Sequence, residues 1–360
     1  MGPIGLGPVG PGSRGGCSMD VLYLSREEII SLATLDDVLA CVEVAYREKA
    51  VGRGVYPLVY EGLGAAGLDG FRSNMDIRSG VSPCRGLFGA KLITEFPPDS
   101  SDRCGLPVFH SVLQVFDAKT GCLRAVMDGL GVTRLRTGAA AAIGAKWLAR
   151  NDARTLAVVG TGSQCAPVIA SMKRVFSELE RVVLWNPRSH ERALGRLGSI
   201  VDEACSLNPD CARLDIVAEA EGECAIGSAD IVVTATGSKA PLFPAAWVRS
   251  GQHYSCIGAD MPSKREVPSG LVKRARVFAD DRVRVLEFGE MRGAVEEDEI
   301  LAYRIVGEVG EVIRGERRGR VRPDDVTLFD SCGLVTLDIT FASLLMERAS
   351  RQGVGTRLQL

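Results

Sequence analysis

A glycine-rich segment of the sequence has the composition of a phosphate-binding loop. It reads Gly160-Thr161-Gly162-Ser163-Gln164, directly after the apolar run TLAVVG and before a stretch with helical spacing. Gly160 permits a tight turn, Gly162 lets the backbone approach a pyrophosphate, and a helix N-terminus offers unpaired N–H groups to an anion. Cys165 stands in place of a third glycine, so an ordinary strand-to-helix turn is the alternative. We interpret the segment as a dinucleotide-binding loop.

The residues at the end of the next strand-like run indicate which coenzyme this loop would bind. A carboxylate there accepts hydrogen bonds from the adenosine ribose of NAD, but the run RVVLWN is followed by Pro187 and Arg188. Asn186 and Arg188 offer a neutral polar group and a guanidinium, a combination that suits a ribose 2'-phosphate. The alternative is that Arg188 only decorates a helix. We expect NADP(H) to be preferred over NAD(H).

Two other charged residues are candidates for substrate binding and catalysis. Arg136 opens an alanine-rich helical run, where a cation at a helix N-terminus is locally unfavourable and indicates an anionic partner. For Arg134 a plain surface position is the preferred interpretation. Asp260 follows the strand-like run HYSCIGA, and ligands in an open parallel sheet bind beyond the carboxyl ends of strands. We expect Asp260 to hold a substrate ammonium or accept a proton, with a turn-forming role before Pro262 as the alternative.

The elements that must position these residues form two groups. From about residue 150, strand-like and helical runs alternate, with strands predicted at 155–160, 181–186, 214–218, 230–236, 253–259 and 275–280. This alternation indicates a doubly wound parallel sheet, that is, a Rossmann domain over residues 150–326. Before it, the sequence predicts a short strand, a helix capped at Ser25 that continues through Tyr46, and a small mixed sheet with a hairpin at DAKTG.

The predicted fold class is α/β, with the Rossmann domain inserted into a second, α+β domain for substrate binding and dimerisation. Residues 331–349 form a last amphipathic helix that we expect to return to the N-terminal part, so the second domain would comprise residues 19–149 and 327–360. Residues 1–18 are rich in glycine and proline and are expected to be a disordered tail, with Met19 as a candidate initiator.

Composition limits the class of partner. The 360 residues include 43 basic and 45 acidic side chains, which leave no polybasic surface for nucleic acid, so a small molecule is the expected partner. The eleven cysteines lack the spacing of a zinc site and are typical of reduced thiols in a cytoplasmic protein, and we expect no metal. No apolar run would span a bilayer and no signal peptide is evident, so we expect no membrane association.

Several stretches, in this order along the chain, resemble the ornithine cyclodeaminase and mu-crystallin family. They are LRAVMDGLGVTRLRTGAAAAIGAKWLAR, the glycine-rich loop, SADIVVTATGSKAPLF, SGQHYSCIGADMPSKREV and SCGLVTLDITFASLLMERASRQGVGTRLQL. The resemblance runs from about Asp20 to the C-terminus. It implies an NAD(P)-dependent oxidoreductase, expected to be a homodimer, that reduces a ketimine or cyclic imino acid or oxidises the matching amino acid. An amino-acid cyclodeaminase that releases ammonia and a non-catalytic small-ligand binder are the alternatives.

The resemblance also implies roles for individual residues. Lys91 and Arg136 would hold the substrate carboxylate, and Asp260 would be the catalytic carboxylate. The cofactor would be lined by residues at matching family positions, namely Thr137, Thr236, Gly258, Lys264 and Ser331.

The chain departs from the family pattern around the substrate. Family members usually place an arginine just after the proline that matches Pro57, but the next two residues here are apolar. Where the family strand reads MP, this chain has Asn74-Met75-Asp76, and Met75 is expected to contact the substrate. Arg72 or Arg78 is expected to supply the positive charge of the missing arginine. Ser73 replaces an acidic residue of ornithine cyclodeaminase, so efficient cyclisation of ornithine is not expected.

Overall fold

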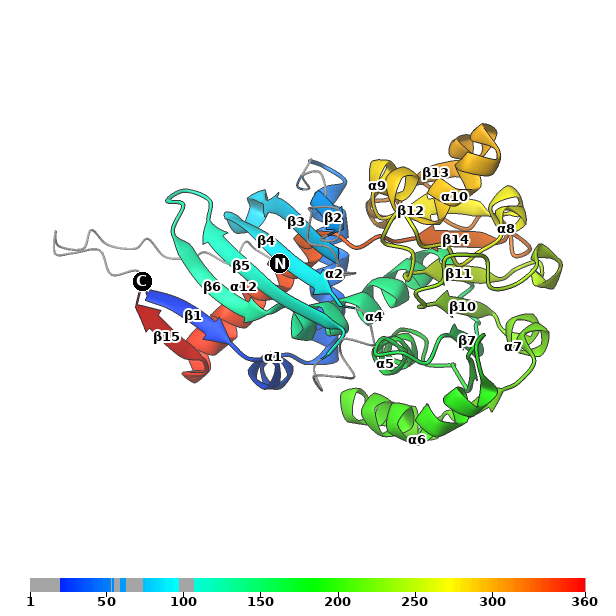
Figure 1. Ribbon diagram of the computed structural model, residues 1–360, viewed down its shortest axis with the longest axis horizontal. Coiled ribbons are helices and arrows are strands. Elements are labelled where there is room, and N and C mark those ends of the chain that lie inside the picture. Colours follow the sequence, from blue (N-terminus) through cyan, green and yellow to red (C-terminus); the bar gives the residue numbers. More distant parts are fainter. Residues whose placement is uncertain (1–19, 53, 55–58, 63–73, 97–106, 360) are drawn as a thin grey trace.

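The computed structural model describes residues 20–52, 54, 59–62, 74–96 and 107–359 and arranges them around two sheets (Figure 1). The expectations for residues 1–18, Arg72 and Ser73 lie outside the described residues. None of the described helices is both long and apolar enough to cross a membrane.

The first sheet has seven strands in the order β15-β1-β6-β5-β4-β3-β2 and is antiparallel except where β1 pairs with β6. Its strands are β1 (Asp20–Leu24), β2 (Val59–Gly62), β3 (Asn74–Ser82), β4 (Leu87–Glu95), β5 (Phe109–Asp117), β6 (Leu123–Asp128) and β15 (Thr356–Gln359), with the 3-10 turn η2 (Pro83–Arg85) between β3 and β4. The hairpin predicted at DAKTG joins β5 and β6, as expected.

Helices α1 (Arg26–Leu32), α2 (Leu35–Lys49) and α12 (Val335–Gln352) accompany this sheet. Ser25 caps α1 as predicted, but the single helix expected as far as Tyr46 is two helices. The reason is a second capping box, in which the Thr34 side chain accepts from the backbone of Asp37 and the chain starts a new helix. The predicted return of the last helix to the N-terminal part is confirmed, because α12 packs on β3, β4 and α2.

The second sheet is entirely parallel and has eight strands in the order β13-β12-β14-β11-β10-β7-β8-β9. The strands are β7 (Thr155–Val159), β8 (Arg181–Trp185), β9 (Asp215–Glu219), β10 (Ile231–Thr234), β11 (His253–Cys256), β12 (Arg276–Ala279), β13 (Ile305–Glu308) and β14 (Thr327–Asp330). The α/β fold class with a doubly wound domain is confirmed, and each of the six predicted strands is present.

Helices cover this sheet and connect its strands. They are α5 (Cys165–Val175), α6 (His190–Leu207), α7 (Gly222–Ser228), α8 (Ser269–Arg274), α9 (Arg282–Glu287), α10 (Glu290–Glu297) and α11 (Val309–Ile313), with the 3-10 turns η3 (Pro209–Arg213), η4 (Ala245–Trp247) and η5 (Glu299–Arg304).

Strand β14 differs from the expected domain division. It lies between β12 and β11, inside the eight-stranded sheet, so this sheet extends beyond residue 326. Residues 327–360 were expected to lie wholly in the other domain. The run TLFD has only two apolar residues, Leu328 and Phe329, so its sequence carries little strand signal.

Helix α4 (Gly129–Leu148) lies between the two sheets (Figure 1). It is buried along most of its length because small residues let neighbouring elements approach closely. A Cβ on Gly138 would lie 2.6 Å from the backbone of Pro167 in α5, and one on Gly144 would lie 2.3 Å from the ring of Phe329 in β14. One continuous hydrophobic core therefore extends from the first sheet through α4 to the second.

Candidate active site

A cleft of about 1400 Å³ lies between the two sheets, beyond the carboxyl ends of β7, β8, β10 and β11. The opposite wall comes from β3, β4 and the first half of α4. The cleft brings together most of the residues that the sequence singled out, namely Arg136, Thr137, Gly160, Thr161, Gly162, Ser163, Gln164, Asn186, Arg188, Thr236, Gly258, Asp260, Lys264 and Ser331.

The glycine-rich loop forms one end of this cleft. Gly160 has a φ of 107°, and a Cβ there would lie 2.8 Å from the carbonyl oxygen of Ala235, so only glycine fits. No atom lies within 4 Å of the Cβ position of Gly162, which leaves open space beside the N-terminus of α5. Cys165 is fully buried at the start of α5, so its small side chain takes the packing position of the third glycine.

Two unpaired polar atoms in the cleft indicate that a polar ligand belongs there. The Thr137 hydroxyl and the Gln164 side-chain oxygen are buried and have no hydrogen-bond partner among the described residues. Buried polar groups are nearly always hydrogen-bonded in folded proteins. Together with the helix N-terminus and the open space at Gly162, they fit a dinucleotide held by residues 160–164, Thr137 and Thr236.

Three arginines line the cleft beyond β8. Arg188, Arg192 and Arg196 are exposed, follow one another at a spacing of four residues and form no ion pair with a described residue. Asn186 donates to the Thr161 hydroxyl at 2.9 Å and accepts from the Arg188 backbone at 3.0 Å, which fixes the turn before α6. Arg188 was predicted from the sequence, but Arg192 and Arg196 were not, although their i, i+4 spacing is visible in the sequence.

Glu266 was not predicted, yet it holds together two loops that line the cleft. Its buried carboxylate accepts from the Thr234 hydroxyl at 2.8 Å, the Thr236 backbone at 2.6 Å and the Gly258 backbone at 3.0 Å. Burial raises the pKa of Glu266 to about 6. The carboxylate of Glu290 in turn accepts from the backbone of Glu266 at 2.8 Å. No local motif marks these contacts, because the partners lie far apart along the chain.

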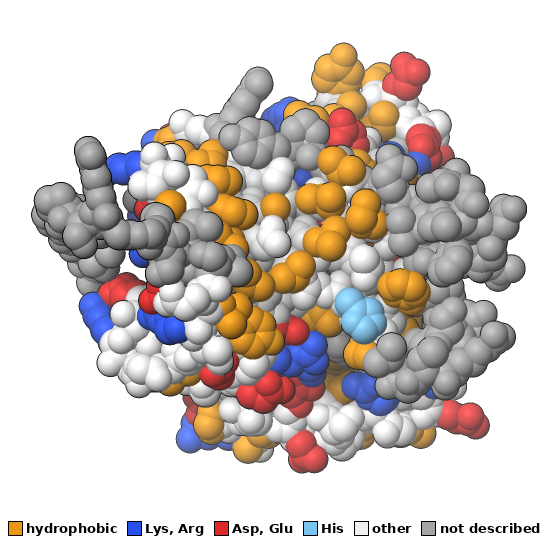
Figure 2. All heavy atoms as spheres, turned by 60° about the vertical axis from the view of Figure 1, so that its left-hand side comes forward, with side chains coloured by type: hydrophobic (Ala, Val, Ile, Leu, Met, Phe, Trp, Pro, Cys, Tyr) orange, Lys and Arg blue, Asp and Glu red, His pale blue; other side chains and the backbone are white. Residues whose placement is uncertain are grey.

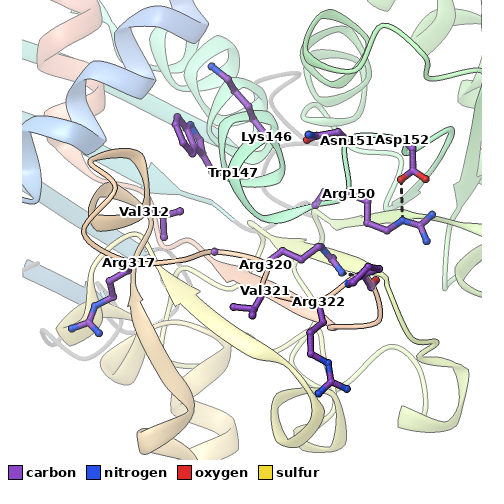
Figure 3. A pocket seen from close by; sticks show the side chains of 13 residues that line it. Lys146, Trp147, Arg150, Asn151, Asp152, Val312, Arg317, Arg320, Val321 and Arg322 are labelled. Atoms are coloured by element: carbon purple, nitrogen blue, oxygen red, sulfur yellow. Dashed lines mark hydrogen bonds and ion pairs between the residues drawn. The ribbon is translucent and has the colours of Figure 1, made fainter.

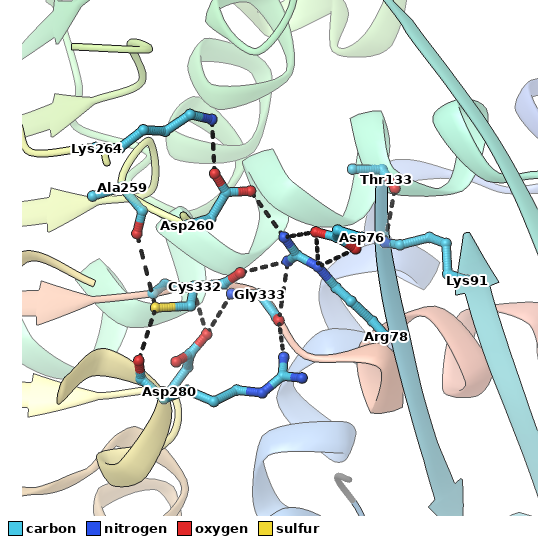
Figure 4. Close-up of polar contacts among 12 residues, drawn as sticks. Asp76, Arg78, Lys91, Thr133, Ala259, Asp260, Lys264, Asp280, Cys332 and Gly333 are labelled. Atoms are coloured by element: carbon cyan, nitrogen blue, oxygen red, sulfur yellow. Dashed lines mark hydrogen bonds and ion pairs between the residues drawn. The ribbon is translucent and has the colours of Figure 1, made fainter. Parts of the chain in front are cut away.

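Asp260 lies at the centre of a charged chain that crosses the cleft (Figure 4). Its two oxygens lie 2.8 Å from Lys264 Nζ and 3.0 Å from Arg78 Nη2, and Arg78 also binds Asp76 at 2.7 Å. Desolvation works to raise the pKa of Asp260, but the charges of Lys264 and Arg78 outweigh it and hold the pKa at about 2. The Asp260 side chain keeps 27% of its surface accessible, so it can meet a ligand.

Arg136 presents a free edge of its guanidinium at the same place. Its side chain is only 4% exposed, and its Nε lies 3.2 Å from Asp338, but no described residue accepts from its two terminal nitrogens. One of them lies 2.9 Å from the position of a Cβ on Gly333, and a terminal nitrogen of Arg78 lies 3.0 Å from that position. The Arg136 and Arg78 guanidiniums therefore lie side by side, next to Asp260.

Lys91 lies behind the cleft wall. It is fully buried, with Nζ 2.8 Å from Asp338 and 2.9 Å from the hydroxyl of Thr133, which itself lines the cleft (Figure 4). Burial and the charge of Arg136 lower the pKa of Lys91 to about 7, in spite of its ion pair with Asp338. Asp338, which joins Lys91 to Arg136, was not predicted.

The structure presents Arg78, and not Met75, to the cleft. Successive side chains of a strand point to opposite faces, so Met75 faces away from the side of the sheet that carries Asp76 and Arg78, and it does not line the cleft. Arg78 pairs in register with Lys91 and is the nearby cation that the sequence analysis offered together with Arg72. Arg72 lies outside the described residues.

A second hollow, of about 800 Å³, lies beside Trp147 on the far end of α4 (Figure 3). It is lined by cations, but each already has partners. Lys146 pairs with Glu43 at 2.7 Å and Arg317 with Glu311 at 3.1 Å, while Arg320 donates to the backbone carbonyls of nearby residues. This hollow therefore offers no free charge to a ligand.

Comparisons with known proteins agree with this arrangement. The sequence model of the ornithine cyclodeaminase/mu-crystallin family matches residues 20–353. The alanine dehydrogenase of Archaeoglobus fulgidus is 31% identical over 347 residues, 95% of this chain and 99% of the relative. The delta(1)-pyrroline-2-carboxylate reductase of Bacillus cereus is 29% identical over 341 residues, 94% of this chain and all of the relative.

Two solved structures are similar over nearly the whole chain. An archaeal alanine dehydrogenase dimer with bound NAD superposes with a TM-score of 0.83 and 30% identity, covering 94% of this chain and 99% of the other. The iminosuccinate reductase of Paracoccus denitrificans in complex with NAD+ has a TM-score of 0.83 and 29% identity, covering 95% of this chain and all of the other.

Proposed function

Because the chain belongs to the ornithine cyclodeaminase/mu-crystallin family, we propose that it is an NAD(P)-dependent oxidoreductase acting on the α-carbon of an imino or amino acid. One observation carries the proposal. The unpaired edge of the Arg136 guanidinium lies beside Arg78 and Asp260, in the same cleft as the dinucleotide loop. A carboxylate group and a reacting nitrogen can thus be held together next to a nicotinamide.

The substrate carboxylate binds to Arg136, with Lys91 supporting that contact from behind. An arginine fork makes two parallel hydrogen bonds to a carboxylate and fixes its plane. Asp76 and Asp260 neutralise Arg78 and Lys264, whereas the single carboxylate of Asp338 faces both Lys91 and Arg136. When Lys91 is protonated, this pair of cations can therefore accept a second carboxylate, that of the substrate.

Asp260 acts on the nitrogen of the substrate. Its carboxylate is ionised at neutral pH, since its pKa is about 2. A negative charge there attracts the protonated nitrogen of an iminium and keeps the α-carbon electrophilic, and it stabilises the ammonium in the opposite direction. A bound nicotinamide coenzyme supplies or accepts the hydride. Arg78 and Lys264 keep Asp260 in place and in its ionised form.

We also propose that NADP(H) is preferred over NAD(H). Arg188, Arg192 and Arg196 line the cleft without a carboxylate partner, and no described residue at the end of β8 supplies the carboxylate that a ribose diol would need. The two solved structures described above hold NAD, so this preference would distinguish this chain from them. Arg188→Ala should raise the KM for NADPH about tenfold or more and that for NADH about twofold at most.

The control for that variant is Arg213→Ala, which removes a cation that is 81% exposed and pairs with Asp210. It should change neither coenzyme constant. Equal losses of NADPH and NADH binding in Arg188→Ala would contradict the preference.

A screen of substrates tests the reaction itself. Oxidation of NADPH and NADH is followed at saturating preformed cyclic imines, and with 2-oxo acids supplied together with ammonia or amines. A reductase consumes reduced coenzyme in proportion to amine formed. The rival, a cyclodeaminase, releases ammonia from a diamino acid with no net change in coenzyme. If the protein binds imino acids tightly but shows neither activity, it is a non-catalytic ligand-binding protein.

The protein is further proposed to be a homodimer through the outer face of the seven-stranded sheet, the side away from Lys91. Two cross-strand rows of half-buried apolar side chains cover this outer face, Ile77–Leu92–Val112 and Val81–Phe88–Phe116. The rings of Phe88 and Phe116 stack at 4.9 Å. Figure 2 shows hydrophobic side chains gathered on this side of the molecule. A contiguous apolar patch of this kind marks an interaction site, and the archaeal alanine dehydrogenase is described as a dimer.

A further inference from the structure

Glu95 lies in the cleft at the end of β4. Because side chains alternate along a strand, Lys91, Ile93 and Glu95 share one face of the sheet, and both Ile93 and Glu95 line the cleft. In register with Glu95 are Asn74 of β3 and Phe109 of β5, and Phe109 lines the cleft as well. Lys91, Ile93 and Glu95 thus lead from the buried side chains proposed to bind the substrate carboxylate toward the outer end of the cleft, which we call its mouth.

Glu95 differs from the other carboxylates of the cleft in having no partner. Among the described lining residues the carboxylates are Asp76, Glu95 and Asp260, and Arg78 or Lys264 neutralises the first and the last. The carboxylate of Glu95 forms no hydrogen bond or ion pair with a described residue. Its charge raises the pKa of Lys264, so it acts on the partner of Asp260 and lies within electrostatic reach of the reacting centre.

The cations at the mouth do not compensate this charge. Arg26 and Arg134 also line the cleft, but Arg26 pairs with Asp128 at 3.3 Å and Arg134 pairs with Glu203. The arginines of the coenzyme end belong to α6 and the turn before it, on the opposite wall. The unneutralised charge that β4 contributes to the cleft is therefore negative.

The spacing along β4 suits the side chain of an extended substrate. A strand rises about 3.4 Å per residue, so the Cα atoms of Lys91 and Glu95 are roughly 13 Å apart. A substrate whose carboxylate binds Arg136 and whose nitrogen meets Asp260 can direct its side chain outward along β4. Ile93 and Phe109 would then contact its methylene groups, and its tip would reach Glu95.

We propose that Glu95 is a specificity residue that selects substrates whose side chain ends in a positive charge, an ammonium or guanidinium carried on several methylene groups. The inference rests on the proposed function and adds the class of side chain to it. A carboxylate facing a cation in a cleft forms a charge-assisted hydrogen bond, which a neutral side chain cannot replace.

The test compares pairs of amino acids that differ mainly in charge. The full-length protein is supplied with saturating oxidised coenzyme and one amino acid at a time. L-Arginine is compared with L-citrulline, and L-lysine with L-norleucine. Ammonia release is measured, because both a dehydrogenase and a cyclodeaminase produce it. The wild type should prefer the charged member of each pair in kcat/KM by about tenfold or more, the lower range for a charge-assisted hydrogen bond.

The variant Glu95→Gln keeps the shape of the side chain and removes its charge. It should bring the two kcat/KM values of each pair within about threefold by lowering that of the charged member, while kcat/KM for the neutral member and the KM for coenzyme stay unchanged. Glu180→Gln is the matched control, because it removes a carboxylate that is 62% exposed and pairs with Arg154 away from the cleft. It should keep the wild-type preference.

Two results would overturn the proposed role of Glu95 without contradicting the proposed function. The wild type could use neutral substrates as well as charged ones, or Glu95→Gln could lower both members of a pair alike or weaken coenzyme binding. A wild type that releases no ammonia from any amino acid and reduces no imine in the coenzyme screen would instead refute the proposed function, and the role of Glu95 with it.

Discussion

A substitution at Asp260 tests the proposed chemistry most directly. Asp260→Asn keeps the size of the side chain, but its amide can accept from only one of Lys264 and Arg78, and it cannot stabilise a protonated nitrogen by charge. We expect turnover to fall about 100- to 10,000-fold, the range for loss of an acid/base group, with coenzyme affinity almost unchanged. Steady-state kinetics and a fluorescence titration with NADPH measure the two. Comparable turnover in variant and wild type would remove Asp260 from the mechanism.

Lys91 makes substrate binding depend on pH. Its pKa in the free protein is lowered to about 7, mainly by burial and also by Arg136, with Asp338 acting in the opposite direction. Lys91 is therefore charged below pH 7 and neutral above it, and only the charged form attracts a carboxylate. Affinity for a carboxylate ligand should be constant below about pH 7 and fall as the pH rises, by up to about tenfold per unit.

The ligand for this measurement is pyrrole-2-carboxylate, an unreactive planar analogue of a cyclic imino acid whose nitrogen does not titrate in the range used. Its Kd is determined by calorimetry from pH 6 to 9. Lys91→Arg, which stays charged throughout, should bind it with no break near pH 7. A flat Kd in the wild type would show that Lys91 keeps its proton or takes no part in binding.

The separate residues of the site could be predicted from sequence to different degrees. The dinucleotide loop and Asp260 carry local patterns, and the cleft contains both of them. Arg136 also lines the cleft, but the expected position at a helix N-terminus was wrong, because α4 begins at Gly129 and Arg136 lies inside it. Asp338 carries none, because its partner Lys91 lies 247 residues away along the chain and only folding brings them together. Met75 was placed at the substrate by resemblance, but strand alternation turns it to the other face.

At the scale of elements, one buried carboxylate joins the loops that follow β10 and β11. Glu266 accepts from two backbone N–H groups and a hydroxyl, and Glu266→Gln would place an amide donor against some of these donors. We expect weaker coenzyme binding, by about tenfold, and a lower Tm, since a buried donor without a partner costs about 1–3 kcal/mol.

Coenzyme titration and thermal unfolding measure these effects. Glu297→Gln, which alters a carboxylate of α10 that is 54% exposed, serves as the control and should affect coenzyme binding little. If Glu266→Gln lowered the Tm but left coenzyme affinity unchanged, Glu266 would support the fold without positioning the two loops.

Elements were predictable where they are long or follow a clear pattern. The six strands with apolar runs and the alanine-rich helix were found, although α4 begins at Gly129, earlier than the alanine-rich run starting at Thr137. The strands β13 and β14 were missed. Length alone is not the reason, because β10, β11 and β12 also have four residues each and were found. In β13, Gly307 and Glu308 interrupt the apolar run, and in β14 only Leu328 and Phe329 are apolar.

At the scale of the whole molecule, the outer face of the seven-stranded sheet predicts the oligomeric state. Leu92→Glu, alone or combined with Phe88→Glu, places a charge within the apolar rows and should convert a dimer to a monomer. Multi-angle light scattering after size-exclusion chromatography measures the mass. Val321→Glu changes an apolar residue that is 51% exposed elsewhere and should leave the dimer intact. A monomeric wild type would contradict the proposed interface.

The position of β14 has a consequence for how the chain folds during synthesis. Strand β14, which lies inside the eight-stranded sheet between β12 and β11, begins at residue 327, and the seven-stranded sheet needs α12 on one face and β15 beside β1. A nascent chain that has not yet passed these residues leaves β11 and β12 with unpaired edges and the first sheet uncovered. Neither half can complete its core until residues 327–359 have been made, so the two halves must mature together.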